Sequence, residues 1–92
     1  MIQRYIIEKQ WVVYIIQTTS NKLYTGITND LDKRFANHSK GRSGAKFFRL
    51  ETPKKIVFQE VHSNRSEATK REIAIKKMSR EQKLHLINSN QV

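Results

Sequence analysis

A glutamate on the apolar face of an expected helix is the first candidate for chemistry in this sequence. Ala68, Glu72 and Ile75 lie at positions i, i+4 and i+7, which share one helix face. An inward carboxylate needs a partner, and a hard divalent cation such as Mg²⁺ prefers oxygen ligands and often accepts only one or two carboxylates. The alternative partner is Lys76, one turn further on, in an i,i+4 ion pair. Both partners fit the spacing.

An arginine and a histidine share the apolar stripe of an earlier expected helix. The stripe follows the i, i+3, i+4 and i+7 pattern and consists of Leu31, Arg34, Phe35 and His38. Because Arg34 and His38 point the same way as the apolar contacts, the pattern favours a cleft between this helix and a sheet. The alternative is that both side chains flank the core with their polar ends in water.

Two strands and a hairpin are expected ahead of these helices. Trp11 to Gln17 is dense in aromatic and β-branched residues, which predicts a buried strand. Leu23 to Thr28 predicts a second, shorter strand. The polar stretch Thr18 to Lys22 between them indicates an antiparallel hairpin.

A third strand is expected from Lys55 to Val61, after a long loop. Strict alternation would place Ile56 and Phe58 on one face of this strand. The same alternation would place Val57 and Val61 on the other face, so both faces need cover.

Helix boundaries follow from capping residues. The first helix is expected to begin near Asn29, with Asp32 in the capping-box position, and to run to about Ser39 before Gly41. For the second helix, the predicted N-cap is Asn64, again with an acidic residue three positions later, Glu67. Ser79 marks an expected break into a third helix that contains Leu84, Leu86 and Ile87.

The element order β-β-α-β-α-α predicts a small α/β protein of the α+β type, with a three-stranded, mainly antiparallel sheet flanked by helices. A length of 92 residues fits one domain over residues 1–92, with its core at about 11–88. The chain has no cysteine, so any metal must be held by oxygen or imidazole. The longest apolar run, Trp11 to Ile16, is short of the ~20 residues of a membrane span, which favours the cytoplasm and no membrane partner.

The net charge of +10 and the pI near 10.2 indicate a polyanionic partner, with nucleic acid favoured over an anionic membrane. Lys40 to Pro53 is expected to be a long basic loop with little regular structure. The residues expected to contact the nucleic-acid backbone are Lys40, Arg42, Lys46, Arg49, Lys54 and Lys55.

Two tripeptides in the expected strands resemble those that name the GIY-YIG endonucleases. They are Val13-Tyr14-Ile15 and Tyr24-Thr25-Gly26, and nine residues separate the two tyrosines. Arg34 and His38 follow on the next helix and Glu72 on a later one, in the order of the family motif. The resemblance covers about residues 12 to 87 and is closest to the compact bacterial single-domain branch.

The resemblance implies a metal-dependent endonuclease that hydrolyses phosphodiester bonds, on DNA rather than RNA, in processes such as DNA repair. In this scheme Glu72 would hold one Mg²⁺ or Mn²⁺ and Arg34 would neutralise the developing negative charge. Tyr14 would act as general base, helped by His38 or a nearby lysine, and Tyr24 would position the water or the phosphate. The surrounding Lys and Arg side chains are expected to favour the Tyr14 phenolate.

Several positions depart from the family pattern. Val13 replaces glycine in the first tripeptide and Thr25 replaces isoleucine in the second. The family often has an asparagine after the glutamate-bearing helix, but Asn88 stands at a longer spacing and no role is carried over to it. Larger members append a DNA-binding domain, so target choice is expected here from this domain, a homodimer or a partner protein.

Two other functions remain open. The first is a nucleic-acid-binding module that kept the fold and the charge but not efficient catalysis. The second is a basic protein-interaction or ribosome-associated domain, in which Glu72 pairs with Lys76 and the tyrosines belong to the core. Metal dependence on labelled DNA separates these alternatives from the nuclease.

Overall fold

The computed structural model describes residues 10–40 and 45–90. Its elements are β1 (Trp11–Thr18), β2 (Leu23–Thr28), α1 (Leu31–Lys40), the short 3-10 helix η1 (Lys46–Arg49), β3 (Pro53–His62), α2 (Arg65–Lys76) and α3 (Arg80–Ser89). The predicted order β-β-α-β-α-α and the α+β class are therefore confirmed. None of the helices within the described residues has the length and hydrophobicity that a transmembrane span needs.

β1 is the middle strand of a three-stranded antiparallel sheet in the order β2-β1-β3. The predicted hairpin joins β1 to β2 through a tight turn in which the Thr18 N–H donates to the Lys22 carbonyl at 2.9 Å. Asn21 takes a positive φ of 69° in this turn, a conformation that asparagine tolerates better than most residues. The hairpin sets the register that pairs Tyr14 of β1 with Gly26 of β2.

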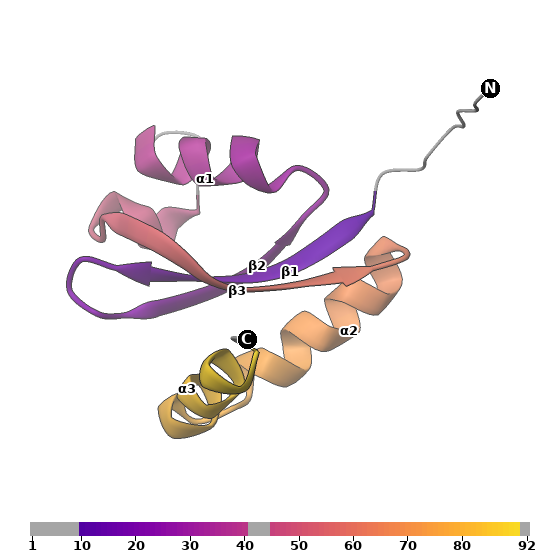
Figure 1. Ribbon diagram of the computed structural model, residues 1–92. Coiled ribbons are helices and arrows are strands. Elements are labelled where there is room, and N and C mark those ends of the chain that lie inside the picture. Colours follow the sequence, from indigo (N-terminus) through magenta and orange to yellow (C-terminus); the bar gives the residue numbers. More distant parts are fainter. Residues whose placement is uncertain (1–9, 41–44, 91–92) are drawn as a thin grey trace.

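Helices cover both faces of the sheet, with α1 and η1 on one side and α2 and α3 on the other (Figure 1). Successive residues of β1 therefore enter two different cores. The core beneath α2 and α3 contains Val13, Ile15, Phe58, Ala68, Ile75 and Ile87. The core beneath α1 and η1 contains Tyr14, Ile16 and Phe48. This alternation turns the Tyr14 side chain toward α1.

The prediction of which β3 side chains share a face of the sheet was wrong. β3 pairs Phe58 with Ile15 but Ile56 with Ile16, so an irregularity at Val57 shifts the register by one residue. As a result Ile56 packs in the α1 core, while Val57 and Phe58 both pack in the core beneath α2 and α3. A bulge adds one residue to a strand and breaks the strict alternation on which the prediction rested.

The helix boundaries agree with the capping signals except at the start of α1. There Asp30, rather than Asn29, accepts the Lys33 N–H at 3.2 Å, because both residues are good caps and Asp30 directly precedes the helix. Asn64 caps α2 as predicted, by accepting the Glu67 N–H at 2.9 Å. Ser79 caps α3 and forms a capping box with Gln82. The predicted stop at Gly41 lies outside the described residues.

The loop between α1 and β3 contains regular structure that was not predicted. Lys46–Arg49 forms η1, and Phe48 in it is buried against the sheet. Two adjacent phenylalanines among basic residues show neither the strand period nor the α-helix period, so the sequence predicts a loop for this segment. Burial of Phe48 gives η1 a fixed position beside Tyr14.

Candidate active site

Tyr14 lies in the middle of the sheet and its side chain crosses toward the open edge at β2. The residue is 1% exposed. A Cβ atom placed on Gly26, its cross-strand partner, would lie 2.5 Å from the Tyr14 Oη and 2.7 Å from its Cζ. Any larger residue at position 26 would displace the ring. The glycine of the second tripeptide is therefore what allows the phenol to lie over β2.

His38 of α1 is fully buried and contacts the Tyr14 phenol directly. Its Nε2 lies 2.9 Å from the Tyr14 Oη, and its Nδ1 accepts the backbone N–H of Ala45 at 3.1 Å. A nitrogen that accepts an N–H carries no proton, so the neutral ring has its proton on Nε2. His38 therefore donates to Tyr14 and does not take a proton from it. The expected assistance of His38 to Tyr14 therefore takes the form of a hydrogen bond that His38 donates.

Burial keeps His38 neutral. It lowers the pKa of His38 to about 4, with a further contribution from the nearby Arg34 guanidinium. The ring is therefore uncharged near neutral pH. A neutral imidazole with a fixed tautomer can hold the Tyr14 oxygen in place without adding a charge to the core.

The expectation that basic side chains favour the Tyr14 phenolate was wrong. Burial raises the pKa of Tyr14 to about 12, and the charges of Tyr24 and Glu72 also raise it. A hydrogen bond from Arg34 and its positive charge lower the pKa only in part. Desolvation of the phenolate outweighs the single guanidinium close to it, because most basic side chains of this protein lie on the exposed surface.

Tyr24 of β2 is half-buried, and its ring lies between Tyr14 and η1. Its ring centroid lies 6.3 Å from that of Tyr14, 5.5 Å from His38 and 5.3 Å from Phe47. The Phe48 ring packs on His38 at a centroid distance of 4.3 Å. Ala45, Phe47 and Phe48 also belong to this site and were not predicted from the sequence. Two aromatic residues next to each other in a basic segment were the available signal.

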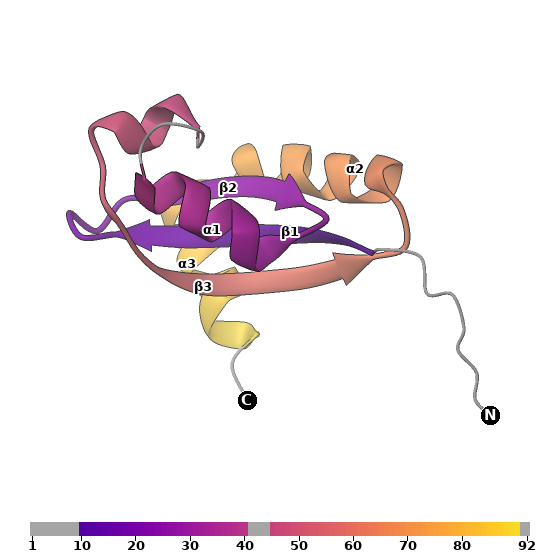
Figure 2. The same cartoon turned by 90° about the horizontal axis from the view of Figure 1, so that it is seen from above.

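Helix α2, which contains Glu72, runs along the β2 side of the sheet (Figure 2). The Glu72 side chain is 17% exposed, and its Oε2 lies 3.1 Å from the Nζ of Lys76. The i,i+4 ion pair between Glu72 and Lys76, one of the two partners that the sequence allows for Glu72, is therefore present. Glu72 also contributes to the raised pKa of Tyr14, so its charge acts on the phenol.

A divalent metal would find one carboxylate in this site. Among the residues that the structure describes, no group of three or more His, Asp or Glu side chains gathers closely enough to hold a metal by itself. Mg²⁺ is often held by one or two carboxylates together with substrate phosphate and water. A single half-buried Glu72 fits that kind of site and does not fit a closed, all-protein metal centre.

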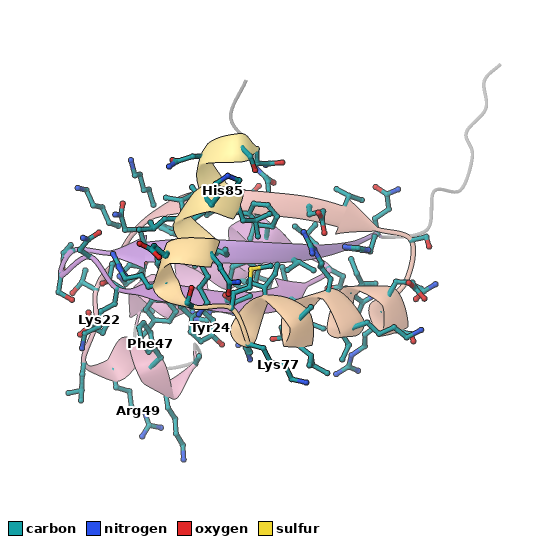
Figure 3. The ribbon with its side chains drawn as sticks, turned by 90° about the horizontal axis from the view of Figure 1, so that it is seen from below. Lys22, Tyr24, Phe47, Arg49, Lys77 and His85 are labelled. Carbon is teal, nitrogen blue, oxygen red and sulfur yellow. The ribbon has the colours of Figure 1, made fainter. Side chains whose placement is uncertain are left out.

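The residues predicted to contact a nucleic-acid backbone come from several elements of the structure. Those described are all exposed, and they are Lys40 at the end of α1, Lys46 and Arg49 in η1, and Lys54 and Lys55 in β3. Arg49 projects away from the body of the protein in Figure 3. Arg42 lies outside the described residues. Asn88 is exposed near the end of α3.

Comparison with known proteins places these residues in a family. The GIY-YIG catalytic domain matches residues 10–85. A UPF0213 protein of Cupriavidus pinatubonensis is 42% identical over 78 residues, which cover 85% of this chain and 86% of the relative. A UPF0213 protein of Clostridium perfringens is 46% identical over 80 residues, which cover 87% and 85% of the two chains.

A solved structure agrees with this assignment. The solution NMR structure of a UPF0213 protein from Bacillus halodurans superimposes with a TM-score of 0.58 at 32% sequence identity. The match covers 88% of this chain and 85% of that one. The matched relatives are short proteins of the same compact type that the sequence resemblance indicated. The chain therefore belongs to the GIY-YIG family.

Proposed function

We propose that this protein is a metal-dependent endonuclease that hydrolyses phosphodiester bonds of DNA. The observation that carries the proposal is the environment of the Tyr14 oxygen. This buried oxygen accepts from the Nε2–H of His38 and from Arg34, the Tyr24 ring lies beside it, and the charge of Glu72 raises its pKa. Membership of the GIY-YIG family supplies the reaction class.

In the proposed reaction, water attacks the phosphorus while the Tyr14 phenolate takes a proton from that water. A new bond forms between the water oxygen and phosphorus, the bond from phosphorus to the leaving oxygen breaks, and the leaving oxygen takes a proton from solvent. The phenolate must form before this step. Its high pKa means that the reaction should accelerate as the pH rises above neutrality.

The neighbours of Tyr14 have separate roles in this proposal. His38 and Arg34 donate to the phenol oxygen and stabilise the phenolate when it forms. Arg34 also neutralises charge that develops on the phosphate. Tyr24, whose ring is only half-buried, positions the water or the phosphate by a hydrogen bond.

Glu72 is the residue that would hold Mg²⁺ or Mn²⁺. When bound there, the cation would offset the negative charge that raises the Tyr14 pKa and would neutralise charge on the phosphate. The ion pair with Lys76 does not prevent this, because Lys76 is 51% exposed and can turn into solvent.

Binding of the DNA backbone is assigned to the exposed basic residues on and around η1. The proposed contacts are Lys40, Arg42, Lys46, Arg49, Lys54 and Lys55. Contacts of this kind position a strand without selecting its sequence. Affinity should therefore fall steeply with added salt and change little between sequences.

The direct test is cleavage of labelled duplex, single-stranded and branched DNA, with Mg²⁺ or Mn²⁺ added in steps and with a chelator as control. The nuclease is supported if at least one substrate is cleaved, and if this cleavage depends on added metal and stops when the chelator is present. Contaminating nucleases are excluded by purifying Tyr14→Phe in parallel.

A second candidate function has specific support. The raised pKa of Tyr14 and the Glu72–Lys76 ion pair both suit a nucleic-acid-binding module that does not cleave. Salt-sensitive binding to DNA, with no cleavage of any substrate at any metal concentration or pH from 7 to about 9, would establish this function instead.

A further inference from the structure

A small pocket with a cationic rim lies beside the candidate active site. It opens between η1 and α3 at the start of β2, has a volume of about 280 Å³, and is lined by Lys22, Leu23, Phe47, Arg80 and Lys83. None of these residues has a role in the proposed chemistry. Phe47 nevertheless connects the pocket to that site, because its ring contacts the Tyr24 ring at 5.3 Å.

We propose that this pocket binds one unpaired nucleotide of the DNA strand next to the cleaved bond, with its base against Phe47 and its phosphate near Arg80 and Lys83. This inference rests on the proposed action on DNA and adds a substrate class, namely DNA with an unpaired nucleotide. Figure 3 shows Lys22, Phe47 and Tyr24 on the same side of the molecule.

The side chains of the pocket match the two halves of a nucleotide. Phe47 is half-buried, so part of its ring remains available, and Leu23 adds a second apolar surface. Nucleic-acid bases stack on such aromatic rings without regard to sequence. The volume is close to the ~300 Å³ at which small-molecule pockets begin, which suits one nucleotide and not a paired duplex.

The charges of the pocket favour a phosphate. Lys22 is already paired with Glu51 at 3.2 Å. Arg80 and Lys83 form no ion pair with any residue in the described ranges. Two cations that pair with no described carboxylate, next to an aromatic ring, are complementary to a nucleotide's phosphate and base.

The position of the pocket indicates which nucleotide would enter. Tyr24 contacts both Phe47 and Tyr14, at centroid distances of 5.3 and 6.3 Å. A strand whose phosphate lies at Tyr14 therefore passes Tyr24 before it reaches Phe47. A base that stacks on Phe47 must leave its helical stack, and unstacking costs least where the base is already unpaired.

The test is DNA binding by a cleavage-deficient protein, Glu72→Gln, in the presence of a chelator. Fluorescence anisotropy compares a single strand of about 12 nucleotides with a blunt duplex of equal length. Phe47→Leu, added to this protein, should weaken single-strand binding at least about fivefold and change duplex binding by less than about twofold. Lys83→Gln should act in the same direction, while Lys70→Gln, which removes an equal charge from the exposed face of α2, should affect both substrates alike.

An abasic scan makes the test specific. One base at a time is removed from the single-stranded oligonucleotide. Removal of the base that occupies the pocket should weaken binding to Glu72→Gln, and this loss should disappear when Phe47→Leu is added. The proposal would be overturned if Phe47→Leu weakened binding of single strand and duplex equally. It would also be overturned if the effect of the missing base were the same with and without Phe47→Leu. If Phe47→Leu melts well below the parent, Arg80→Gln with Lys83→Gln carries the test. Loss of the single-strand preference supports the proposal, and an unchanged preference overturns it.

The outcomes separate this inference from the nuclease proposal. Binding is measured without metal and without cleavage, so an inactive protein can still show the predicted dependence on Phe47. A protein that cleaves DNA but shows no abasic effect would contradict the pocket alone. A protein that binds neither form of DNA would contradict both proposals.

Discussion

The Nε2–H of His38 donates to the Oη of Tyr14 across 2.9 Å of buried space. The direction of this hydrogen bond is set by the Ala45 N–H, which occupies the other ring nitrogen. Helix α1, strand β1 and the segment before η1 therefore meet at one pair of side chains. Charging His38 would require a second donor at Nδ1, where the Ala45 N–H already points.

This pair makes stability depend on pH. The pKa of His38 falls from an ordinary value near 6.5 to about 4 on folding, so its contribution is fully present above pH 6.5 and is lost as the pH falls toward 4. The loss should approach about 3 kcal/mol in the free energy of unfolding. Urea unfolding of the parent and of His38→Gln, from pH 7 to pH 4, gives the free energy of unfolding of each protein as a function of pH. The parent should lose more stability than His38→Gln over this range. Equal losses for the two proteins would show that His38 titrates normally.

Tyr14→Phe removes one hydroxyl and keeps the ring. The buried His38 Nε2–H then loses its acceptor, so the protein should lose about 1 to 2 kcal/mol of stability. Metal-dependent cleavage should fall to background, while DNA affinity should stay within about twofold because the ring is 1% exposed. Tyr14→Phe that cleaves at the parent's rate would remove Tyr14 from the role of base.

Gly26→Ala tests the contact that places the phenol over β2. A Cβ at this position would lie 2.5 Å from the Tyr14 Oη, so the ring must move. We expect a loss of about 1 to 3 kcal/mol of stability, as for other overpacked sites, together with loss of cleavage. In the Tyr14→Phe background the nearest atom is gone, so thermal denaturation should show a smaller cost for Gly26→Ala there. Additive costs would mean that the two residues do not interact.

Thr25→Val, one position before Gly26 in β2, should raise stability. The Thr25 hydroxyl is buried and has no hydrogen-bond partner in the described structure. Valine has nearly the same shape and no polar group to bury, so stability should rise by about 1 kcal/mol. The thermal midpoint, measured beside that of the parent, checks this gain. A lower midpoint would show that the hydroxyl finds a partner in solution.

Local patterns predicted most of the fold. β-branched and aromatic density located β1 and β2, and polar caps located α2 and α3, since each depends on neighbours in sequence. The bulge at Val57 and the burial of Phe48 depend on β1 and α1, which lie far from them in sequence. No local pattern contains that information, so the faces of β3 and the 3-10 helix η1 were not predicted.

The candidate site was predicted in part for the same reason. The stripe of Arg34 and His38 and the inward position of Glu72 follow from helical periodicity. The pKa of Tyr14 does not, because it depends on how completely β1 is covered by α1 and η1. Counting basic residues gave the wrong direction, since net charge reports the surface and desolvation acts in the core.

The substitution Glu72→Gln tests the central claim most directly. The amide keeps the size of the side chain but removes the charge proposed to hold a divalent cation, so cleavage should fall at least about a hundredfold. Folding and DNA binding should persist, because the ion pair with the exposed Lys76 contributes no more than about 1 kcal/mol. Glu67→Gln is the control, since it breaks a more exposed ion pair with Lys70 on the same helix and should cleave like the parent. Equal cleavage by Glu72→Gln and Glu67→Gln, beside an active parent, would contradict the account.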